Sequence, residues 1–277
     1  MRISEIFGYG ADNHSAEAWR ARELKWCPFR GDSCTKSSKT DPVGVCSLSN
    51  GQKAAALCPA RFLEKDRIFS DAARLAFGDG VRFGVFPEVR ILKIESEAGR
   101  QQRKIGKVDY VLGKLDGEII TDFAALEVQA VYFSGGEIRT LLRNYLETRK
   151  LEAEDSRRRP DFRSSAQKRL VPQLHLKVPV FRRWGKKFFV VTDSMFFSSM
   201  PSFKATTRSN SELTWLTYPI VKTGQDYVMR DPEVIYSEWD EVRNSLREGV
   251  PPEPSEIMEE LQEKLHSKRR KPRIMSS

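Results

Sequence analysis

The stretch VDYVLGKLDGEIITDFAALEVQA, residues 108–130, decides the fold and carries the first chemical signal. Two strand-like runs rich in β-branched residues flank Asp116–Gly117, a dipeptide that favours a tight hairpin. Asp109 stands at the start of the first run, and Glu127 stands near the end of the second. A hairpin that pairs the two runs brings these carboxyl groups to neighbouring strands.

The sequence around Glu127 favours a metal site. Glu127 lies inside the apolar run FAALEVQAVYF, where a charged side chain is costly to bury without a partner. Residues two apart on a strand share a face, so Gln129 points the same way as Glu127. Two carboxylates aimed at one point are ligands for a hard divalent cation such as Mg²⁺, and the carbonyl of Val128 is a further candidate ligand. Glu88, in FPEVRI, is a third candidate carboxylate.

A structural role competes with this interpretation. Taken singly, Asp109 is typical of a charge at a strand edge, and Glu127 is typical of a partner for an arginine. The pair in a strand–turn–strand context favours catalysis, because a bound metal activates water and screens the charge of an attacked phosphate.

Elements on both sides of this hairpin indicate an α/β fold. Helical periodicity and stop signals predict helices, and alternating or continuous apolar runs predict strands. The order indicates a mixed sheet flanked by helices. The predicted helices are residues 16–26 (after Ser15), 66–77 (before Gly78) and 137–154. The predicted strands are residues 81–94, 108–115, 119–133 and 187–197.

All four cysteines lie in one short region, at Cys27, Cys34, Cys46 and Cys58, with the spacing C-x6-C-x11-C-x11-C. In a reducing compartment, clustered thiols favour a metal site over disulfides. Four thiolates suit tetrahedral zinc or iron, and the spacing also fits an iron–sulfur cluster. Unligated structural thiols or a transient disulfide are the alternatives.

Composition restricts the class of protein. The 277 residues have a net charge of +9, which favours a polyanionic partner, although a generically basic protein has the same balance. No apolar run approaches the roughly 20 residues of a membrane span. The N-terminal MRISEIFGYGADN has no apolar signal-peptide core, so we expect a cytoplasmic protein.

The residues around the two acids resemble the PD-(D/E)xK nucleases. Asp109 matches the first acid of that motif and follows Val108 where the motif has proline, whereas Glu127 matches the second acid. Gln129 stands where the motif usually has lysine. NotI-type restriction endonucleases share this departure, and they share a four-cysteine metal site ahead of the nuclease core. The resemblance covers roughly residues 20–150.

This resemblance implies a function and a mode of assembly. It implies a Type II restriction endonuclease, a homodimer that cuts double-stranded DNA at a palindrome with Mg²⁺. The four cysteines would hold structural iron or zinc close to the DNA. The family and the arginine content together indicate a GC-rich site, since arginine is the commonest reader of guanine. Because Gln129 replaces the usual lysine, the resemblance does not indicate which residue acts as the general base.

Arginines near the predicted site are candidates for DNA contact, although most such side chains are solvated or only position phosphates. The candidates are Arg139, Arg143, Arg157, Arg158, Arg159 and Arg163. The segment Arg269–Arg270–Lys271, in a basic tail, is expected to give nonspecific attraction to DNA.

We expect three regions along the chain. Residues 1–65 hold an N-terminal helix and the four cysteines, residues 66–200 form the nuclease core, and residues 201–277 contribute DNA or dimer contacts. Two other functions remain open at this point. One is a noncatalytic, metal-stabilised DNA-binding protein, and the other is an iron–sulfur repair nuclease.

Overall fold

A computed structural model describes residues 2–94, 103–133, 138–151, 160–247, 252–266 and 272–274. The chain divides into two compact units, Met1–Leu246 and Arg247–Ser277. The larger unit contains both main sheets and the predicted site. In the part of the chain that the structure describes, no helix is both long and apolar enough to cross a membrane.

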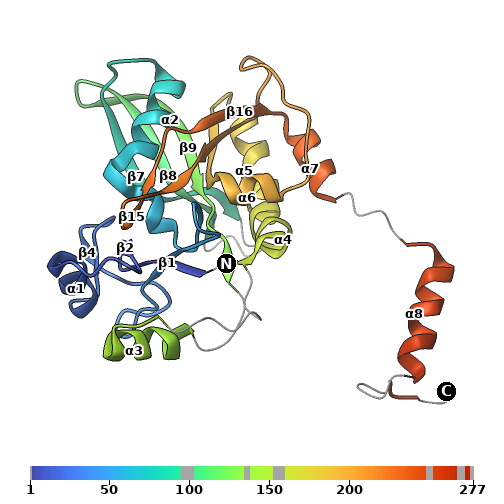
Figure 1. Cartoon of the computed structure of the whole chain (residues 1–277). Coiled ribbons are helices and arrows are strands. Elements are labelled where there is room, and N and C mark those ends of the chain that lie inside the picture. Colours follow the sequence, from blue (N-terminus) through green and yellow to red (C-terminus); the bar gives the residue numbers. More distant parts are fainter. Residues whose placement is uncertain are drawn as a thin grey trace. The chain divides into compact units, whose positions relative to one another are not determined.

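The larger unit is built on a mixed sheet, which confirms the predicted class (Figure 1). Its spatial order within the described residues is β16-β13-β12-β9-β8-β7. β7, β8 and β9 form an antiparallel meander, whereas β12 runs parallel to both β9 and β13. The strands are β7 (Phe83–Ile94), β8 (Arg103–Asp116), β9 (Ile119–Val128), β12 (Phe188–Asp193), β13 (Leu213–Tyr218) and β16 (Glu233–Ser237).

Helices cover the two faces of this sheet because its strands alternate between two apolar clusters. Leu126 of β9 belongs to the cluster that also holds Ile68 and Ala72 of α2 (Arg67–Phe77). Its neighbour Ala125 belongs to the other cluster, with Phe181 of α5 (Val171–Arg183). The helix predicted at 66–77 is therefore confirmed, and Gly78 follows it as its C-cap.

The predicted strand 187–197 is correct for its first part and wrong for its last. β12 ends at Asp193, and α6 (Ser194–Ser199) begins directly after it. The Asp193 carboxylate accepts a hydrogen bond from the Phe196 backbone N–H at 2.8 Å and so caps the helix. The apolar run was continuous across this cap, so hydrophobicity alone did not show where the strand ended.

A second sheet joins the two ends of the larger unit. Its order in the described residues is β15-β14-β6-β5-β1-β2, so strands from beyond residue 200 pair with strands from the first 65 residues. Residues 1–65, 66–200 and 201–246 thus belong to one compact unit, whereas the rest of the third expected region belongs to the smaller unit. The strands are β1 (Arg2–Ile6), β2 (Tyr9–Gly10), β5 (Val45–Ser49), β6 (Lys53–Ala56), β14 (Ile220–Thr223) and β15 (Asp226–Met229).

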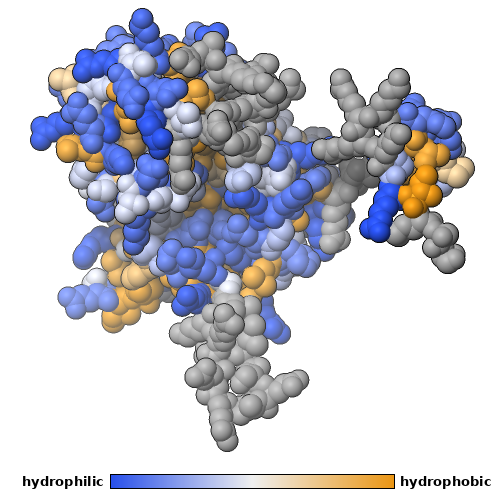
Figure 2. All heavy atoms as spheres, turned by 90° about the horizontal axis from the view of Figure 1, so that it is seen from below, coloured by the Kyte–Doolittle hydropathy of each residue, from blue (hydrophilic) through white to orange (hydrophobic). Residues whose placement is uncertain are grey.

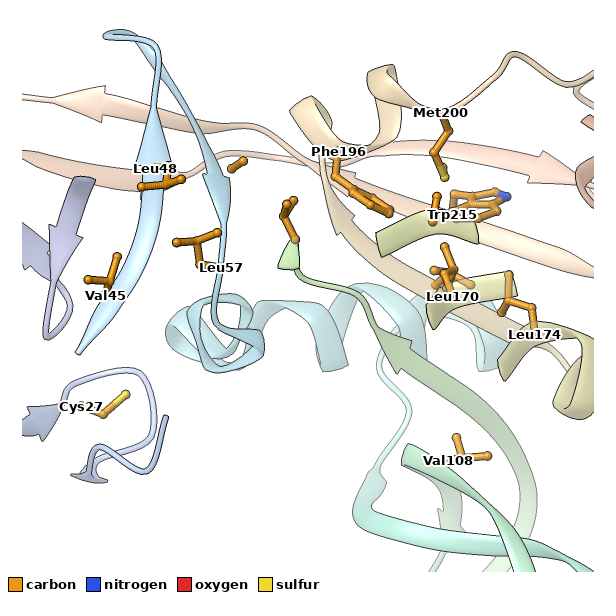
Figure 3. Packing of buried hydrophobic residues seen from close by; sticks show 14 of the residues in the cluster. Cys27, Val45, Leu48, Leu57, Val108, Leu170, Leu174, Phe196, Met200 and Trp215 are labelled. Carbon is orange, nitrogen blue, oxygen red and sulfur yellow. The ribbon is translucent and has the colours of Figure 1, made fainter. Parts of the chain in front are cut away.

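One apolar cluster runs from this second sheet to the main one. It includes Val45, Leu48 and Leu57 on one side and Phe196 and Trp215 on the other (Figure 3). Its members are nearly without exposed surface, so burial holds the two sheets together. A hydrogen bond also connects the two sheets, because the Asp193 carboxylate of β12 accepts the backbone N–H of Ala56 in β6 at 3.0 Å.

Helix α1 (Ala16–Glu23) confirms the predicted helix after Ser15, whose hydroxyl accepts the Ala18 N–H at 3.2 Å. The helix expected over 137–154 is α3 (Ile138–Thr148), and residues 152–154 lie outside the described part. α3 packs near α1, since Tyr145 stacks on Trp19 with ring centroids 5.8 Å apart.

The remaining elements are short or peripheral. They are β3 (Trp26–Cys27), β4 (Asp32–Ser33), the 3₁₀ segment η1 (Pro59–Asp66), β10 (Tyr132–Phe133), β11 (Pro160–Asp161), α4 (Phe162–Ser164), the π-helical η2 (Ser165–Leu170) and α7 (Trp239–Arg247). In the smaller unit, α8 (Pro254–His266) carries a row of exposed apolar side chains along one side (Figure 2).

Candidate active site

The two predicted acids face each other on adjacent strands. The β8–β9 register pairs Tyr110 with Leu126, and one step further along it sets Asp109 opposite Glu127. The Asp109 backbone N–H lies 3.5 Å from Glu127 Oε2, and the Val128 N–H donates to Asp109 Oδ2 at 2.9 Å. The hairpin at Asp116–Gly117 therefore produces the juxtaposition that the sequence predicted.

Burial perturbs both carboxyl groups. Burial, and then the negative charge of Asp109, raise the pKa of Glu127 to about 7, against the opposing effect of Lys177. Burial likewise raises the pKa of Asp109, while the Val128 N–H and the charge of Lys177 act to lower it. Two neighbouring acids with raised pKa values are typical of a functional site, because the charged forms of both are costly unless a ligand such as a cation neutralises them.

Sequence reasoning missed a lysine in this site. Lys177 Nζ lies 2.5 Å from Glu127 Oε1 and 3.0 Å from Gln173 Oε1, and only 4% of its side chain is exposed. It comes from α5, a helix that the sequence analysis did not predict because Pro172 and Pro179 interrupt its pattern.

A signal for Lys177 was nevertheless present. Leu174, Lys177, Val178 and Phe181 follow the i, i+3, i+4, i+7 spacing of a buried helical stripe, and all four are buried. A lysine on such a stripe needs a buried partner of opposite charge. Recognition of the helix would therefore have identified the lysine as a candidate site residue.

Gln129 lies just beyond the end of β9 and is 7% exposed. Its backbone N–H donates to Val191 of β12 at 2.9 Å, which fixes its position beside the sheet. Its side-chain amide donates to the carbonyl of Ala130 at 2.5 Å. Gln129 therefore stands at the site without touching Glu127 through any of these bonds.

Glu88 lies on β7 at the level of Asp109, because Pro87 pairs with Tyr110 and Val89 with Val108. Its φ of 58° falls in the left-handed region, which is unfavourable for a residue with a side chain. The carboxylate is exposed and contacts Lys107 Nζ at 2.7 Å, and that contact lowers its pKa. Glu88 therefore lies at the same end of the sheet as Asp109.

A cavity of about 990 Å³ opens at this end of the sheet. Glu88, Asp109, Val128 and Gln129 form one part of its wall. Glu127 is only 2% exposed and is not part of this wall, but it lies beside Asp109. Glu88 and Asp109 therefore stand where a large ligand has access to them.

The other walls of the cavity carry positive charge. Arg30 and Lys36 come from the cysteine region, and Arg169 comes from η2. Arg169 lies over the ring of Tyr132, with its Cζ 3.8 Å from the centroid. Cations around a pair of carboxylates suit a phosphate-bearing ligand that arrives together with a divalent metal.

The four cysteines come from different elements and converge. Cys27 is in β3, Cys34 follows β4, Cys46 is in β5 and Cys58 precedes η1. Burial raises the pKa of Cys27, Cys46 and Cys58, and each of these also feels the charge of at least one of the other cysteines.

Backbone N–H groups face three of these thiols: those of Arg30 and Phe29 at Cys27, Gly8 at Cys46 and Ala60 at Cys58. Such donors stabilise thiolates. In the part of the chain that the structure describes, no three Cys, His, Asp or Glu side chains are arranged closely enough to be a metal site. The four thiols are neighbours without a formed coordination shell.

The structure describes only part of the predicted arginine set. Arg143 on α3 and Arg163 on α4 are exposed, as DNA-contacting side chains must be. Arg139 begins α3, but its side chain lies outside the described part, as do Arg157, Arg158, Arg159 and the tail segment Arg269–Arg270–Lys271.

Comparison with known proteins identifies the family of this chain. The comparisons with curated proteins and with solved structures give no match. The family described as restriction endonuclease NotI matches residues 13–229, which is well over half of the chain and includes the cysteines and the paired acids. The chain therefore belongs to the NotI family of restriction endonucleases.

Proposed function

We propose that Asp109 and Glu127 form the Mg²⁺ site of a Type II restriction endonuclease with a PD-(D/E)xK fold. Membership of the family gives a DNA-cleaving enzyme that acts on double-stranded DNA. One observation carries the finer assignment: the Asp109 backbone N–H lies 3.5 Å from Glu127 Oε2, so the buried Glu127 lies beside the half-buried Asp109, and Asp109 lines a cavity whose wall also carries cations.

In this proposal each residue has a separate task. One oxygen of Asp109 is held by the Val128 N–H, which leaves the other to face a ligand. The Val128 carbonyl and Glu88 complete the candidate ligand set at the same edge of the sheet. A bound Mg²⁺ would lower the pKa of a water molecule and offset the charge of the attacked phosphate. Gln129 orients water or phosphate, since an amide cannot act as a charged base.

We also propose that Cys27, Cys34, Cys46 and Cys58 hold one structural iron or zinc ion. Support comes from their mutual proximity and from the backbone N–H groups that face the sulfur atoms. Thiolates are the ligands both metals prefer in closed tetrahedral sites.

DNA is proposed to enter the cavity with its backbone against Arg30, Lys36 and Arg169. A homodimer would place two such sites on the two strands of a palindrome, because a two-fold axis in the protein matches that of the sequence. Arg143 and Arg163 remain candidates for base or phosphate contacts, together with Arg139, Arg157, Arg158 and Arg159. Guanine readout by such arginines would favour a GC-rich site.

Substitution of Glu127 tests this assignment. Glu127→Ala and Asp109→Ala are expected to abolish Mg²⁺-dependent cleavage while DNA binding in Ca²⁺ persists, because each removes a metal ligand and no DNA contact. Asp122→Ala is the matched control, since Asp122 lies on the same strand but pairs with Lys186 at 2.5 Å. It should cleave within about threefold of the wild-type rate, as expected for a surface ion pair.

Cleavage by Glu127→Ala at the wild-type rate would refute the catalytic assignment. DNA binding by the wild-type protein without scission under any divalent ion would instead indicate a noncatalytic DNA-binding protein. A smear of unrelated ends would indicate a processing nuclease.

A further inference from the structure

The burial of Lys177 is not explained by a gain in the free energy of folding. Its ammonium group and the Glu127 carboxylate are both nearly without exposed surface, with side chains 4% and 3% exposed. Replacement of a buried ion pair by apolar side chains is often neutral or stabilising, because desolvation offsets most of the attraction. The surrounding stripe of α5, with Leu174, Val178 and Phe181, is apolar and would accept such a replacement.

The contacts of Lys177 are arranged around the metal-binding acids. Its ammonium binds Glu127 Oε1 at 2.5 Å, whereas Glu127 Oε2 faces the backbone N–H of Asp109. Its second partner is Gln173, one turn earlier on α5, and Gln173 lines the cavity. The ammonium therefore lies between a buried carboxylate and the cavity wall.

In each acid of the site, one carboxylate oxygen is held by a hydrogen bond or an ion pair. Asp109 Oδ2 is fixed by the Val128 N–H on β9, and Glu127 Oε1 is fixed by Lys177 on α5. Without the second of these contacts, Glu127 would keep one weak hydrogen bond at 3.5 Å and the repulsion of Asp109. Like charges in a buried site push each other apart unless a counter-charge is fixed nearby.

We propose that Lys177 is a positioning residue of the cleavage reaction, supplied by α5: its buried ammonium fixes Glu127 Oε1 and so aims Oε2 toward the metal shared with Asp109. This inference rests on the proposed function. The motif has no positive charge at Gln129, and in this inference Lys177 supplies that charge from a different element, α5. Lys177 acts through Glu127 and need not touch the DNA.

Three substitutions at one position separate charge, hydrogen bonding and packing. Lys177→Met keeps the volume and removes both charge and hydrogen bond, Lys177→Gln keeps a hydrogen-bond donor, and Lys177→Arg keeps the charge. Lys186→Met is the matched control, because Lys186 forms a 2.5 Å pair with Asp122 on the same strand, outside the site. Each variant is assayed as full-length protein for kcat, for the Mg²⁺ concentration at half-maximal rate and for DNA affinity in Ca²⁺.

A positioning role predicts a split between these readouts. Lys177→Met should lower kcat by about 100-fold, the usual effect of a misplaced catalytic group. It should also raise the half-maximal Mg²⁺ concentration, while DNA affinity stays within about threefold, as for a residue without DNA contact. Lys177→Arg should cleave faster than Lys177→Gln, and this comparison decides the matter if Lys177→Met does not fold. Lys186→Met should behave like wild type.

The outcomes distinguish this inference from the function on which it rests. Wild-type cleavage, inactive Glu127→Gln and fully active Lys177→Met would overturn the inference alone. Equal rates for the Arg and Gln variants would do the same, as would parallel loss of DNA affinity and kcat in Lys177→Met. No cleavage by the wild-type protein would overturn the proposed function and this inference with it.

Discussion

At the scale of single residues, the site combines two acids, Asp109 and Glu127, that the sequence predicted with a lysine, Lys177, that the sequence analysis did not predict. Asp109 and Glu127 were predictable because local turn chemistry at Asp116–Gly117 sets the pairing of their strands. Lys177 was missed, because two prolines obscure the helical spacing around it and its partner lies 50 residues away in sequence. Contacts of that separation depend on the packing of α5 onto the sheet, which no local pattern fixes.

The raised pKa of Glu127 predicts a pH dependence of metal binding. Since burial and Asp109 raise this pKa to about 7, a proton competes with Mg²⁺ below that pH. The half-maximal Mg²⁺ concentration should rise by up to about tenfold for each pH unit below 7 and level off above it, as for competition with one proton. Cleavage rates measured across Mg²⁺ concentrations at several pH values give this quantity.

The same shift has an opposite consequence for the metal-free protein. A carboxyl group whose pKa is higher in the folded than in the unfolded state stabilises the fold at low pH, and that stabilisation is lost as the pH rises through 7. The free energy of unfolding in EDTA should therefore fall between about pH 4.3, the ordinary pKa of glutamate, and pH 7. Glu127→Gln should lack this fall, and an unchanged slope in that variant would contradict the pKa assignment.

At the scale of elements, η1 connects the cysteine region to the second sheet through one buried arginine. Arg61 Nε donates to Glu5 Oε2 of β1 at 2.8 Å, and its other nitrogens reach Glu64 and the carbonyl of Tyr227 in β15. Neither Arg61 nor Glu5 has exposed side-chain surface. Cys58 immediately precedes this element, so Arg61 also helps to place a thiol.

Loss of this arginine should be costly. Arg61→Ala leaves Glu5 buried without its counter-charge and is expected to lower the free energy of unfolding by about 3–5 kcal/mol. Lys222→Ala, which removes a pair between β14 and the exposed Asp12, should cost about 0–1 kcal/mol. Urea denaturation of both variants measures the difference. Equal losses would show that the buried network does not hold the second sheet.

The cysteine elements give a separate prediction about the structural metal. Cys46→Ser removes one of the buried neighbouring thiols and is expected to lower bound iron or zinc severalfold and to reduce the melting temperature. Elemental content and thermal unfolding measure both effects, and visible absorbance separates thiolate-bound iron from zinc. A wild-type protein that contains no iron or zinc and has the same melting temperature as the variant would contradict the proposal of a structural metal.

Elements also show where prediction from the sequence stopped. The helices at α1 and α2 and the meander β7–β9 were predictable because caps, stops and turns are local. The π-helical turn η2, the proline-bearing α5 and the strand-to-helix change at Asp193 were missed, since tertiary packing overrides local preference there.

At the scale of the whole molecule, the cysteine region contributes side chains to the cavity that Asp109 lines. β14 and β15, from the C-terminal third, complete the sheet begun by β1 and β5, and Arg30 and Lys36 of the cysteine region line the cavity together with Asp109. The predicted division at residues 65 and 200 followed the order of motifs along the chain and had no information on this pairing.

The net charge of +9 fits the same arrangement, because the cations at the cavity add a local attraction for the phosphate backbone to the overall one. Neither term specifies a sequence. Specificity must come from base contacts, for which the exposed Arg143 and Arg163 are the described candidates.

The central claim is that the paired acids cut double-stranded DNA at a specific sequence. A long mixed-sequence duplex is incubated with the protein and Mg²⁺, and all new ends are mapped by sequencing, with Glu127→Ala as the parallel sample. We predict that every wild-type end falls at one palindromic sequence, with the same offset on both strands, and that the variant produces none. Ends scattered over unrelated sequences, no ends under any divalent ion, or identical ends from Glu127→Ala would contradict the account.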